Sequence, residues 1–293
     1  MAAGRLGGTV NVAVIGGGRM GAGIAQVFLA TGAHVTVAEA GERASAAARE
    51  RIARGLRVAE EKGGLARKDG PGDGGSPAEE ALARLVTGPV PAGADLVVEA
   101  VPEDAALKVR VLAEAEKAAG PHAVLATNTS SLSVGELAAG LERPERFLGL
   151  HFFNPVPVQE LVEIVTAPAT SAETLARAKE WVAGLGKTGV VIRDSPGFAT
   201  SRLGVLVGLE AIRMVEEGVA SAEDIDRAMV LGYRYPMGPL RLGDLVGLDV
   251  RLAIAEYLCE RLGPRFEPPE LLRRKVAAGE LGRKTGRGFY DWD

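Results

Sequence analysis

The chain has 293 residues, 47% of them hydrophobic and 25% charged, with 34 basic and 38 acidic side chains that leave a net charge of −4. An acidic balance disfavours a protein whose main task is to grip a nucleic-acid backbone, and no apolar run approaches the ~20 residues of a membrane span. Cys259 is the only cysteine, which excludes an internal disulfide and a thiolate metal cluster, so no metal site is expected.

Taken in chain order, the first ten residues, MAAGRLGGTV, carry no apolar segment that would direct secretion, so we expect a cytoplasmic protein. From Val10 to about Ile192, short β-rich runs alternate with helical patterns. Such alternation is typical of an α/β protein with a doubly wound, mainly parallel sheet and helices on both faces. The expected strands are VNVAVIG, HVTVAEA, DLVVEAV, AVLATN, FLGLHFF, LVEIVT and GVVIRD.

Two features divide this pattern. Residues 63–80, GGLARKDGPGDGGSPAEE, contain enough Gly, Pro and Asp to predict an exposed, mobile loop. After RDSPGF the strand signals stop, and long amphipathic patterns such as SRLGVLVGLEAIRMVEEGV follow. The sequence therefore predicts a Rossmann-type domain over residues 1–193 and an all-helical domain over residues 194–293.

A glycine-rich turn follows the first strand. Gly16, Gly18 and Gly21 have GxGxxG spacing between a strand and a helix, and Glu39 ends the second strand about 20 residues later. The glycines allow a tight turn and a close approach of backbone to a pyrophosphate, while the acid can accept a hydrogen bond from a ribose 2′-hydroxyl. Because Glu39 would repel a 2′-phosphate, NAD is favoured over NADP, although Arg43 lies nearby.

Polar residues also follow the strand AVLATN. Ser133 and Glu136 match a helix capping box, which explains Ser133 structurally. Asn128 and Ser130 lie between strand and cap, at an edge where ligands of such sheets gather. They either face a ligand or only satisfy the backbone of the turn.

The stretch GLHFFNPVPVQELVEIV places His151 and Glu163 in two apolar strands. Burying an unpaired charge there would cost several kcal/mol or force the group neutral. For a lone histidine, a satisfied core position is the simpler explanation. A neighbouring carboxylate and a glycine-rich site favour catalysis instead, since a buried Glu fixes the tautomer of a His and stabilises its charged form.

The chain resembles the 3-hydroxyacyl-CoA dehydrogenase family, specifically its single-function bacterial type that acts on 3-hydroxybutyryl-CoA. The resemblance spans Val10 to the C-terminus and rests on VIGGGRMGAGIA, DLVVEAVPED, ATNTSSL, GLHFFNPVPVQELVEIV, DSPGF, YPMGPLRLGDLVGLD and GRKTGRGFYDW. It implies an NAD-dependent oxidation of a (3S)-3-hydroxyacyl-CoA to the 3-keto compound, an active site between the two domains, and a homodimer formed through the helical domain.

The resemblance also implies roles for individual residues. His151 corresponds to the general base and Glu163 to the carboxylate that orients it. Ser130 corresponds to a serine that touches substrate and nicotinamide, and Asn128 lies in the same turn without a separate role. Glu103, Lys108 and Lys284 match contacts to the nicotinamide side of NAD, although a solvated helix face would explain Glu103 and Lys108 equally well.

Coenzyme A contacts are expected on the helix after Glu39. Its pattern places Arg43, Arg51, Arg54, Arg57 and Lys62 within an arc of roughly 140°, at 100° per residue, which Glu50 and Glu61 share. A solvated mixed face is therefore an alternative. By resemblance Lys62 contacts CoA, with Arg54 as a further candidate and Ser130 on the acyl side, while Gly55 stands where relatives offer a serine.

One departure and two rival functions remain. Relatives commonly have an asparagine that binds substrate where this chain has Ser201, so Ser201 either keeps a polar contact or only serves its helix. The rivals are a dehydrogenase for a carboxylated substrate such as 3-hydroxyadipyl-CoA and a non-catalytic NAD-binding protein. Retention of both His151 and Glu163 disfavours the latter.

Overall fold

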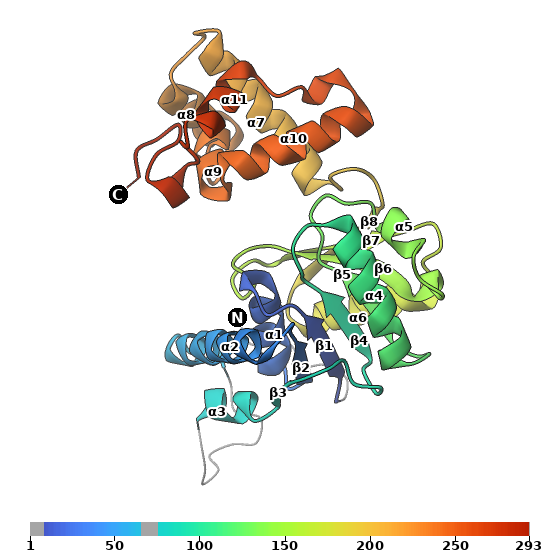
Figure 1. The fold of residues 1–293 in the computed structure, drawn as a ribbon. Coiled ribbons are helices and arrows are strands. Elements are labelled where there is room, and N and C mark those ends of the chain that lie inside the picture. The colour runs from blue at the N-terminus through green and yellow to red at the C-terminus, as the bar shows by residue number, and fades with distance from the viewer. Residues whose placement is uncertain (1–8, 66–75, 293) are drawn as a thin grey trace. The chain divides into compact units, whose positions relative to one another are not determined.

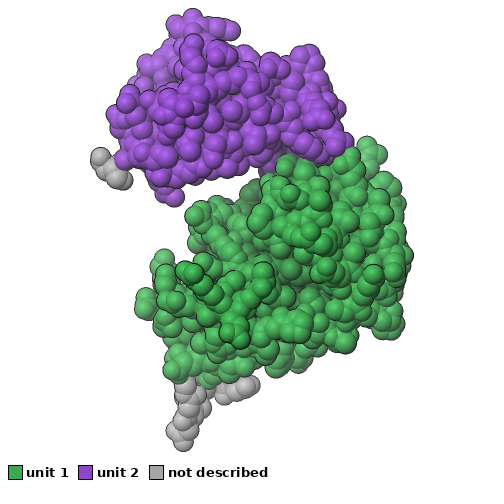
Figure 2. Space-filling model, viewed as in Figure 1, with its two compact units in different colours: residues 1–194 green, residues 195–293 purple. Residues whose placement is uncertain are grey.

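The computed structural model describes residues 9–65 and 76–292, and the chain divides into two compact units at Asp194 (Figures 1 and 2). The first unit is an α/β structure built on one sheet, and the second is helical. The predicted fold class is confirmed. No helix in the described ranges is both long and apolar enough to cross a membrane.

The sheet of the first unit has eight strands in the order β3-β2-β1-β4-β5-β6-β7-β8. All neighbouring strands are parallel except β6 and β7, which pair antiparallel. The strands are β1 (Asn11–Ile15), β2 (His34–Ala38), β3 (Leu85–Thr87), β4 (Leu96–Glu99), β5 (Val124–Thr127), β6 (Phe147–Phe152), β7 (Leu161–Thr166) and β8 (Thr188–Arg193).

Helices cover this sheet, so its central strands are buried along their whole length and are mostly apolar. Every residue of β4, β5 and β6 is buried, whereas the edge strand β8 is largely exposed. Continuous apolar runs of this kind are expected of parallel strands covered on both faces. The helices are α1 (Arg19–Ala30), α2 (Glu42–Glu61), α3 (Pro77–Leu82), α4 (Ala105–Ala119), α5 (Val134–Ala138) and α6 (Ala172–Gly184), with a short 3-10 turn at Pro144–Arg146.

The structure corrects the predicted loop over residues 63–80. Residues 66–75 lie outside the described part of the chain, but α3 begins at Pro77 and the unpredicted strand β3 follows it. Ser76 caps α3: its hydroxyl accepts from the Glu79 N–H, and the Glu79 carboxylate accepts from the Ser76 N–H. This capping box, with proline at the first helical position, is a helix-start signal that the glycine-rich composition obscured.

The second unit is built from five helices and two 3-10 turns in its described residues. Its core contains Val205, Leu209, Leu248, Leu258 and Leu272, all at most 2% exposed. The helices are α7 (Thr200–Glu216), α8 (Ala222–Tyr233), α9 (Pro239–Val246), α10 (Leu248–Leu262) and α11 (Glu270–Ala277), and the turns are Pro264–Phe266 and Arg283–Thr285.

Two buried aspartates fasten residues 288–292 to these helices. Asp244, which is 1% exposed, accepts from the Phe289 N–H (3.0 Å), the Tyr290 N–H (2.9 Å) and the indole N–H of Trp292 (2.9 Å). Asp226 accepts from the Tyr290 hydroxyl at 2.8 Å. Burial and this hydrogen bond raise the pKa of the Tyr290 phenol well above its usual range. The segment is thus part of the unit's folded structure.

Candidate active site

The candidate site lies along the carboxyl-terminal ends of the parallel strands in the first unit. The chain winds outward in opposite directions from β1, to β2 and β3 on one side and to β4, β5 and β6 on the other. Ligands of such sheets bind at this change of direction. The residues at these strand ends are the glycine loop after β1, Glu39 after β2, Glu99 to Glu103 at the end of β4, Asn128 to Ser130 after β5, and His151 near the end of β6.

The glycine loop is shaped for a close backbone approach. Gly16 has φ +92°, a conformation that side chains disfavour, and a Cβ on Gly21 would lie 1.8 Å from the Gly16 carbonyl oxygen. Gly18 is the N-cap of α1, and a Cβ there would meet nothing within 4 Å. The loop therefore leaves open space at the positive end of α1, which fits the pyrophosphate of a dinucleotide.

Each of the two peptide groups that flank Gly17 is held by a charged side chain. Its N–H donates to the Glu39 carboxylate at 2.5 Å, and its carbonyl accepts from the Arg51 guanidinium at 2.5 Å. Glu39 thus lies beside the glycine loop, as its predicted role requires. Arg51 connects the same loop to α2.

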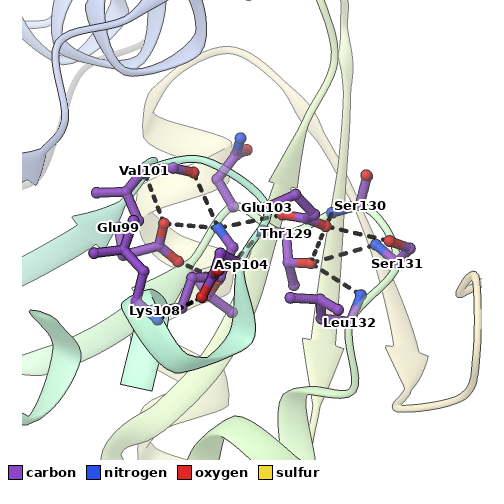
Figure 3. Close-up of polar contacts among 12 residues, drawn as sticks. Glu99, Val101, Glu103, Asp104, Lys108, Thr129, Ser130, Ser131 and Leu132 are labelled. Carbon is purple, nitrogen blue, oxygen red and sulfur yellow. Dashed lines mark hydrogen bonds and ion pairs between the residues drawn. The ribbon is translucent and has the colours of Figure 1, made fainter. Parts of the chain in front are cut away.

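A buried ionic cluster lies beneath the next loop (Figure 3). Glu99 ends β4 with no exposed surface, and its carboxylate accepts from Lys108 Nζ (2.7 Å), the Val101 N–H (2.7 Å) and the Thr127 hydroxyl (2.6 Å). Lys108, 1% exposed, also lies 3.3 Å from a Glu103 oxygen. The predicted cofactor residue Lys108 is therefore held within the protein between two carboxylates.

Glu103 connects this cluster to the turn after β5 (Figure 3). One of its oxygens accepts from the Thr129 hydroxyl (2.5 Å), the Ser130 N–H (3.1 Å) and the Ser131 hydroxyl (3.2 Å). Burial alone would raise the pKa of Glu103, but Lys108 and the hydrogen bonds from Thr129 and Ser130 lower it below its usual value. Glu103 is thus a carboxylate at neutral pH, and its side chain is 38% exposed.

The predicted pair of His151 and Glu163 is formed. The two residues face each other across β6 and β7, and His151 Nδ1 lies 2.7 Å from a Glu163 carboxylate oxygen. His151 is 7% exposed and Glu163 is fully buried. A Glu at Nδ1 favours the tautomer whose proton is on that nitrogen, which leaves the lone pair on Nε2. Such an imidazole can accept a proton and be stabilised when charged.

Asn128 has a contact that the sequence did not reveal. Its side-chain oxygen accepts from the Phe152 N–H at 2.9 Å, next to His151 in β6. The amide therefore joins the turn after β5 to the end of the strand that carries the histidine. This contact gives Asn128 a positioning role.

A separate pocket of about 640 Å³ opens between α1, α2, residues 154–160 and residues 185–187. Three of the five cations predicted on the α2 arc line it, namely Arg51, Arg54 and Lys62, whereas Arg43 and Arg57 do not. One wall is fixed by Lys187, whose ammonium donates to the carbonyls of Val156 (2.7 Å) and Gln159 (2.6 Å). Burial lowers the pKa of Lys187, against the opposing effect of Glu160.

Gln26 occupies the space beside Gly55 in this pocket. A Cβ on Gly55 would lie 2.3 Å from the Gln26 side-chain oxygen, and Gln26 Nε2 donates to the Gly55 carbonyl at 2.9 Å. Glycine at position 55 thus accommodates the glutamine, and a serine there would displace it. Sequence reasoning missed Gln26 because its spacing on α1 carries no chemical signal.

Two predicted site residues belong to the second unit. Ser201 is the second residue of α7, whose N-cap is Ala199, so Ser201 is not the capping residue. Lys284 Nζ lies 2.6 Å from both carboxylate oxygens of Asp249. Burial would raise the pKa of Asp249, but Lys284 lowers it. Over the described ranges, no group of three or more His, Cys, Asp or Glu side chains could hold a metal ion.

Comparisons with known proteins agree over nearly all of the chain. Residues 11–195 match the family model of the 3-hydroxyacyl-CoA dehydrogenase NAD-binding domain, and residues 197–292 match that of the C-terminal domain. A 3-hydroxybutyryl-CoA dehydrogenase of Mycobacterium tuberculosis is 45% identical over 288 residues, covering 96% of this chain and 98% of that protein. The mitochondrial hydroxyacyl-coenzyme A dehydrogenase of Sus scrofa is 42% identical, covering 96% and 91%. The crystal structure of (S)-3-hydroxybutyryl-CoA dehydrogenase from Ralstonia eutropha superposes with a TM-score of 0.90 at 37% identity, covering 98% and 100%.

Proposed function

The chain belongs to the 3-hydroxyacyl-CoA dehydrogenase family of NAD-dependent oxidoreductases, and we propose that it interconverts short-chain (3S)-3-hydroxyacyl-CoA and 3-ketoacyl-CoA with His151 as general base. The observation that carries this proposal is the 2.7 Å contact between His151 and Glu163, in the same sheet edge as the glycine loop. The names of relatives, which act on 3-hydroxybutyryl-CoA, support a short acyl chain.

In the direction of oxidation, His151 Nε2 removes the proton of the 3-hydroxyl group. Glu163 holds the ring through Nδ1 and stabilises the imidazolium that forms. The positive charge of the buried imidazolium is thus compensated by a carboxylate. NAD held at the glycine loop would supply the hydride acceptor for C3. In the reverse direction the imidazolium returns the proton to the forming hydroxyl.

The remaining residues of the first unit bind and orient. Gly16, Gly18 and Gly21 admit the pyrophosphate, and Glu39 accepts from the 2′-hydroxyl of the adenosine ribose. Ser130 lies in the turn that Glu103 holds, where its hydroxyl serves both the nicotinamide and the substrate. From the second unit, Ser201 contributes a polar contact to the substrate and Lys284 a contact to the cofactor.

The pocket lined by Arg54 and Lys62 receives the coenzyme A portion of the substrate. Its volume suits a large ligand, and its cations suit phosphates in a protein whose net charge is −4. Arg54 also pairs with Glu50 at 3.0 Å, a solvent-exposed contact that a phosphate can replace at little cost.

The functional form is a homodimer assembled through the second unit. In support, that unit exposes large apolar side chains, among them Leu203 (62%), Leu231 (73%) and Tyr233 (76%). Their removal from water by a second copy would stabilise the assembly. The cytoplasmic location stays a prediction of the sequence.

The decisive experiment follows NADH absorbance after mixing the purified protein with acetoacetyl-CoA. We expect NADH to be oxidised at a rate that saturates with the concentration of acetoacetyl-CoA. This activity should be lost in the His151→Ala variant. A parallel reaction with the keto form of 3-hydroxyadipyl-CoA tests the substrate: a higher kcat/KM there would replace the short-chain assignment. NADH binding without turnover of either compound would make this a non-catalytic NAD-binding protein.

A further inference from the structure

The order of the strands determines where each half of the dinucleotide lies. The pyrophosphate lies at the glycine loop after β1, and the adenosine ribose reaches Glu39 after β2. The nicotinamide half must therefore extend the other way, over the ends of β4 and β5 and toward His151 in β6. The residues there are the Glu99, Lys108 and Glu103 cluster and the turn at Ser130 (Figure 3).

This cluster carries more negative than positive charge. Two carboxylates and one ammonium, counted as ionised, sum to −2 + 1 = −1. Glu99 and Lys108 are at most 1% exposed, whereas the Glu103 side chain is 38% exposed, so the excess charge faces outward only at Glu103. The distances are unequal as well: Lys108 Nζ lies 2.7 Å from Glu99 and 3.3 Å from Glu103.

Glu99 therefore competes with Glu103 for the single ammonium. The Val101 N–H and the Thr127 hydroxyl fix the carboxylate of Glu99. This carboxylate in turn holds the ammonium of Lys108. The negative charge of Glu103 is therefore only partly compensated by Lys108 at the exposed side of the carboxylate. An oxidised nicotinamide ring carries one positive charge and a reduced ring carries none, so a negative carboxylate at this place favours the oxidised form.

We propose that Glu99 is a positioning residue that acts through Lys108 to keep Glu103 partly uncompensated, and thereby sets the relative affinity of the enzyme for NAD+ and NADH. The proposal rests on the proposed function, since it requires the nicotinamide half above β4 and β5. Glu99 touches neither substrate nor cofactor. Its effect reaches the cofactor through the charge at Glu103.

The test measures dissociation constants of both NAD+ and NADH by titration calorimetry on the full-length protein. Glu99→Gln keeps the length of the side chain but changes the cluster charge from −1 to 0. Within this cluster the ammonium of Lys108 then compensates the charge of Glu103 alone. We expect the ratio Kd(NAD+)/Kd(NADH) to rise about fivefold, the effect of removing one partly screened unit charge near the ring.

Lys108→Met removes the ammonium that partly compensates Glu103, so the exposed carboxylate carries its full negative charge and the same ratio should fall. The double variant should show the same ratio as Lys108→Met, because Glu99 acts through the ammonium that this substitution has already removed. Should Glu99→Gln alone fail to fold, Lys108→Met tests the proposal through a change of the opposite sign, and an unchanged or raised ratio in that variant would overturn it.

Glu116→Gln is the matched control, because Glu116 is also a buried carboxylate (2% exposed) paired with an arginine, Arg143, at 3.5 Å. It lies near the C-terminal end of α4, away from the ends of β4 and β5. Its substitution should lower the melting temperature and leave the ratio unchanged. If the cluster variants behave like this control, Glu99 is only structural and the proposal is overturned. If the wild type binds neither NAD+ nor NADH, the proposed function itself fails.

Discussion

Gly18→Ala separates the stability of the glycine loop from its ability to bind a dinucleotide. The structure predicts almost no effect on folding, because the added Cβ meets nothing within 4 Å and the residue has φ −61°, which alanine adopts readily. Two small terms oppose each other. Alanine is a poorer N-cap than glycine, but it also reduces the entropy of the unfolded chain by about 0.4–1 kcal/mol.

Binding should change much more than stability in this variant. The open space at Gly18 is where the pyrophosphate approaches the N–H groups of α1, so a methyl group there holds the phosphates away. Loss of one hydrogen bond to a charged group is worth about 1.5–3 kcal/mol, which corresponds to a roughly 10–150-fold higher Kd for NADH. The free energy of unfolding should stay within about 1 kcal/mol of the wild type.

The assay pairs NADH fluorescence titration with urea unfolding, and Gly21→Ala serves as the contrasting variant. A Cβ at Gly21 would lie 1.8 Å from the Gly16 carbonyl oxygen, so that variant should lose about 1–3 kcal/mol of stability as well as binding. An unchanged NADH affinity in Gly18→Ala would refute the placement of the pyrophosphate. A fully stable Gly21→Ala would refute the packing argument.

Four further predictions follow from the site. The wild type should use NADH at least about tenfold more efficiently than NADPH in kcat/KM, and Glu39→Ala should narrow that margin, since Glu39 repels a 2′-phosphate. His151→Ala should lower kcat by about 10²–10⁴ while NADH binding stays near normal, and its melting temperature should fall because the fully buried Glu163 loses its contact with the imidazole. Ser201→Ala should lower kcat/KM for acetoacetyl-CoA by about 2–15-fold, with Ser201→Asn tolerated; an unchanged kcat/KM with lower thermal stability would make Ser201 structural. The folded-state pKa of Glu103 is lowered, so its ionised form stabilises the fold above about pH 4.5 and that contribution disappears as the pH falls through the lowered pKa. The stability difference between wild type and Glu103→Gln should therefore shrink as the pH falls below about 4.5 in chemical denaturation.

The fold was predictable from the sequence because its main signals are local. Alternating apolar runs and helical patterns indicated the sheet and the change to an all-helical unit. The strand β3 was missed because three residues, with only Leu85 buried, are too few to show a pattern. The helix α3 was missed for a different reason: its capping box at Ser76 is surrounded by glycines and an acidic residue that favour a loop.

The candidate site was predictable only where a residue type contradicts its surroundings. Glu163 stands out as a carboxylate in an apolar strand, and the same signal was present at Glu99 in DLVVEAV but was not used. The contacts that organise the site could not be predicted, because they join residues far apart in the chain. Asn128 with Phe152 and Arg51 with Gly17 are examples, since only the assembled sheet brings each pair together.

The three hydrogen bonds that Asp244 accepts from the end of the chain have a consequence for biosynthesis. Their donors, on Phe289, Tyr290 and Trp292, are synthesised 45 to 48 residues after the aspartate itself. Until these donors are synthesised, burying the Asp244 carboxylate would leave its charge without hydrogen bonds. Asp244 therefore stays hydrated in a nascent chain that ends at α10. A chain truncated before that segment would lack these three hydrogen bonds and the packing of Phe289 and Tyr290 against the core of the second unit. Incomplete products would thus be distinguishable to proteases and chaperones from finished ones.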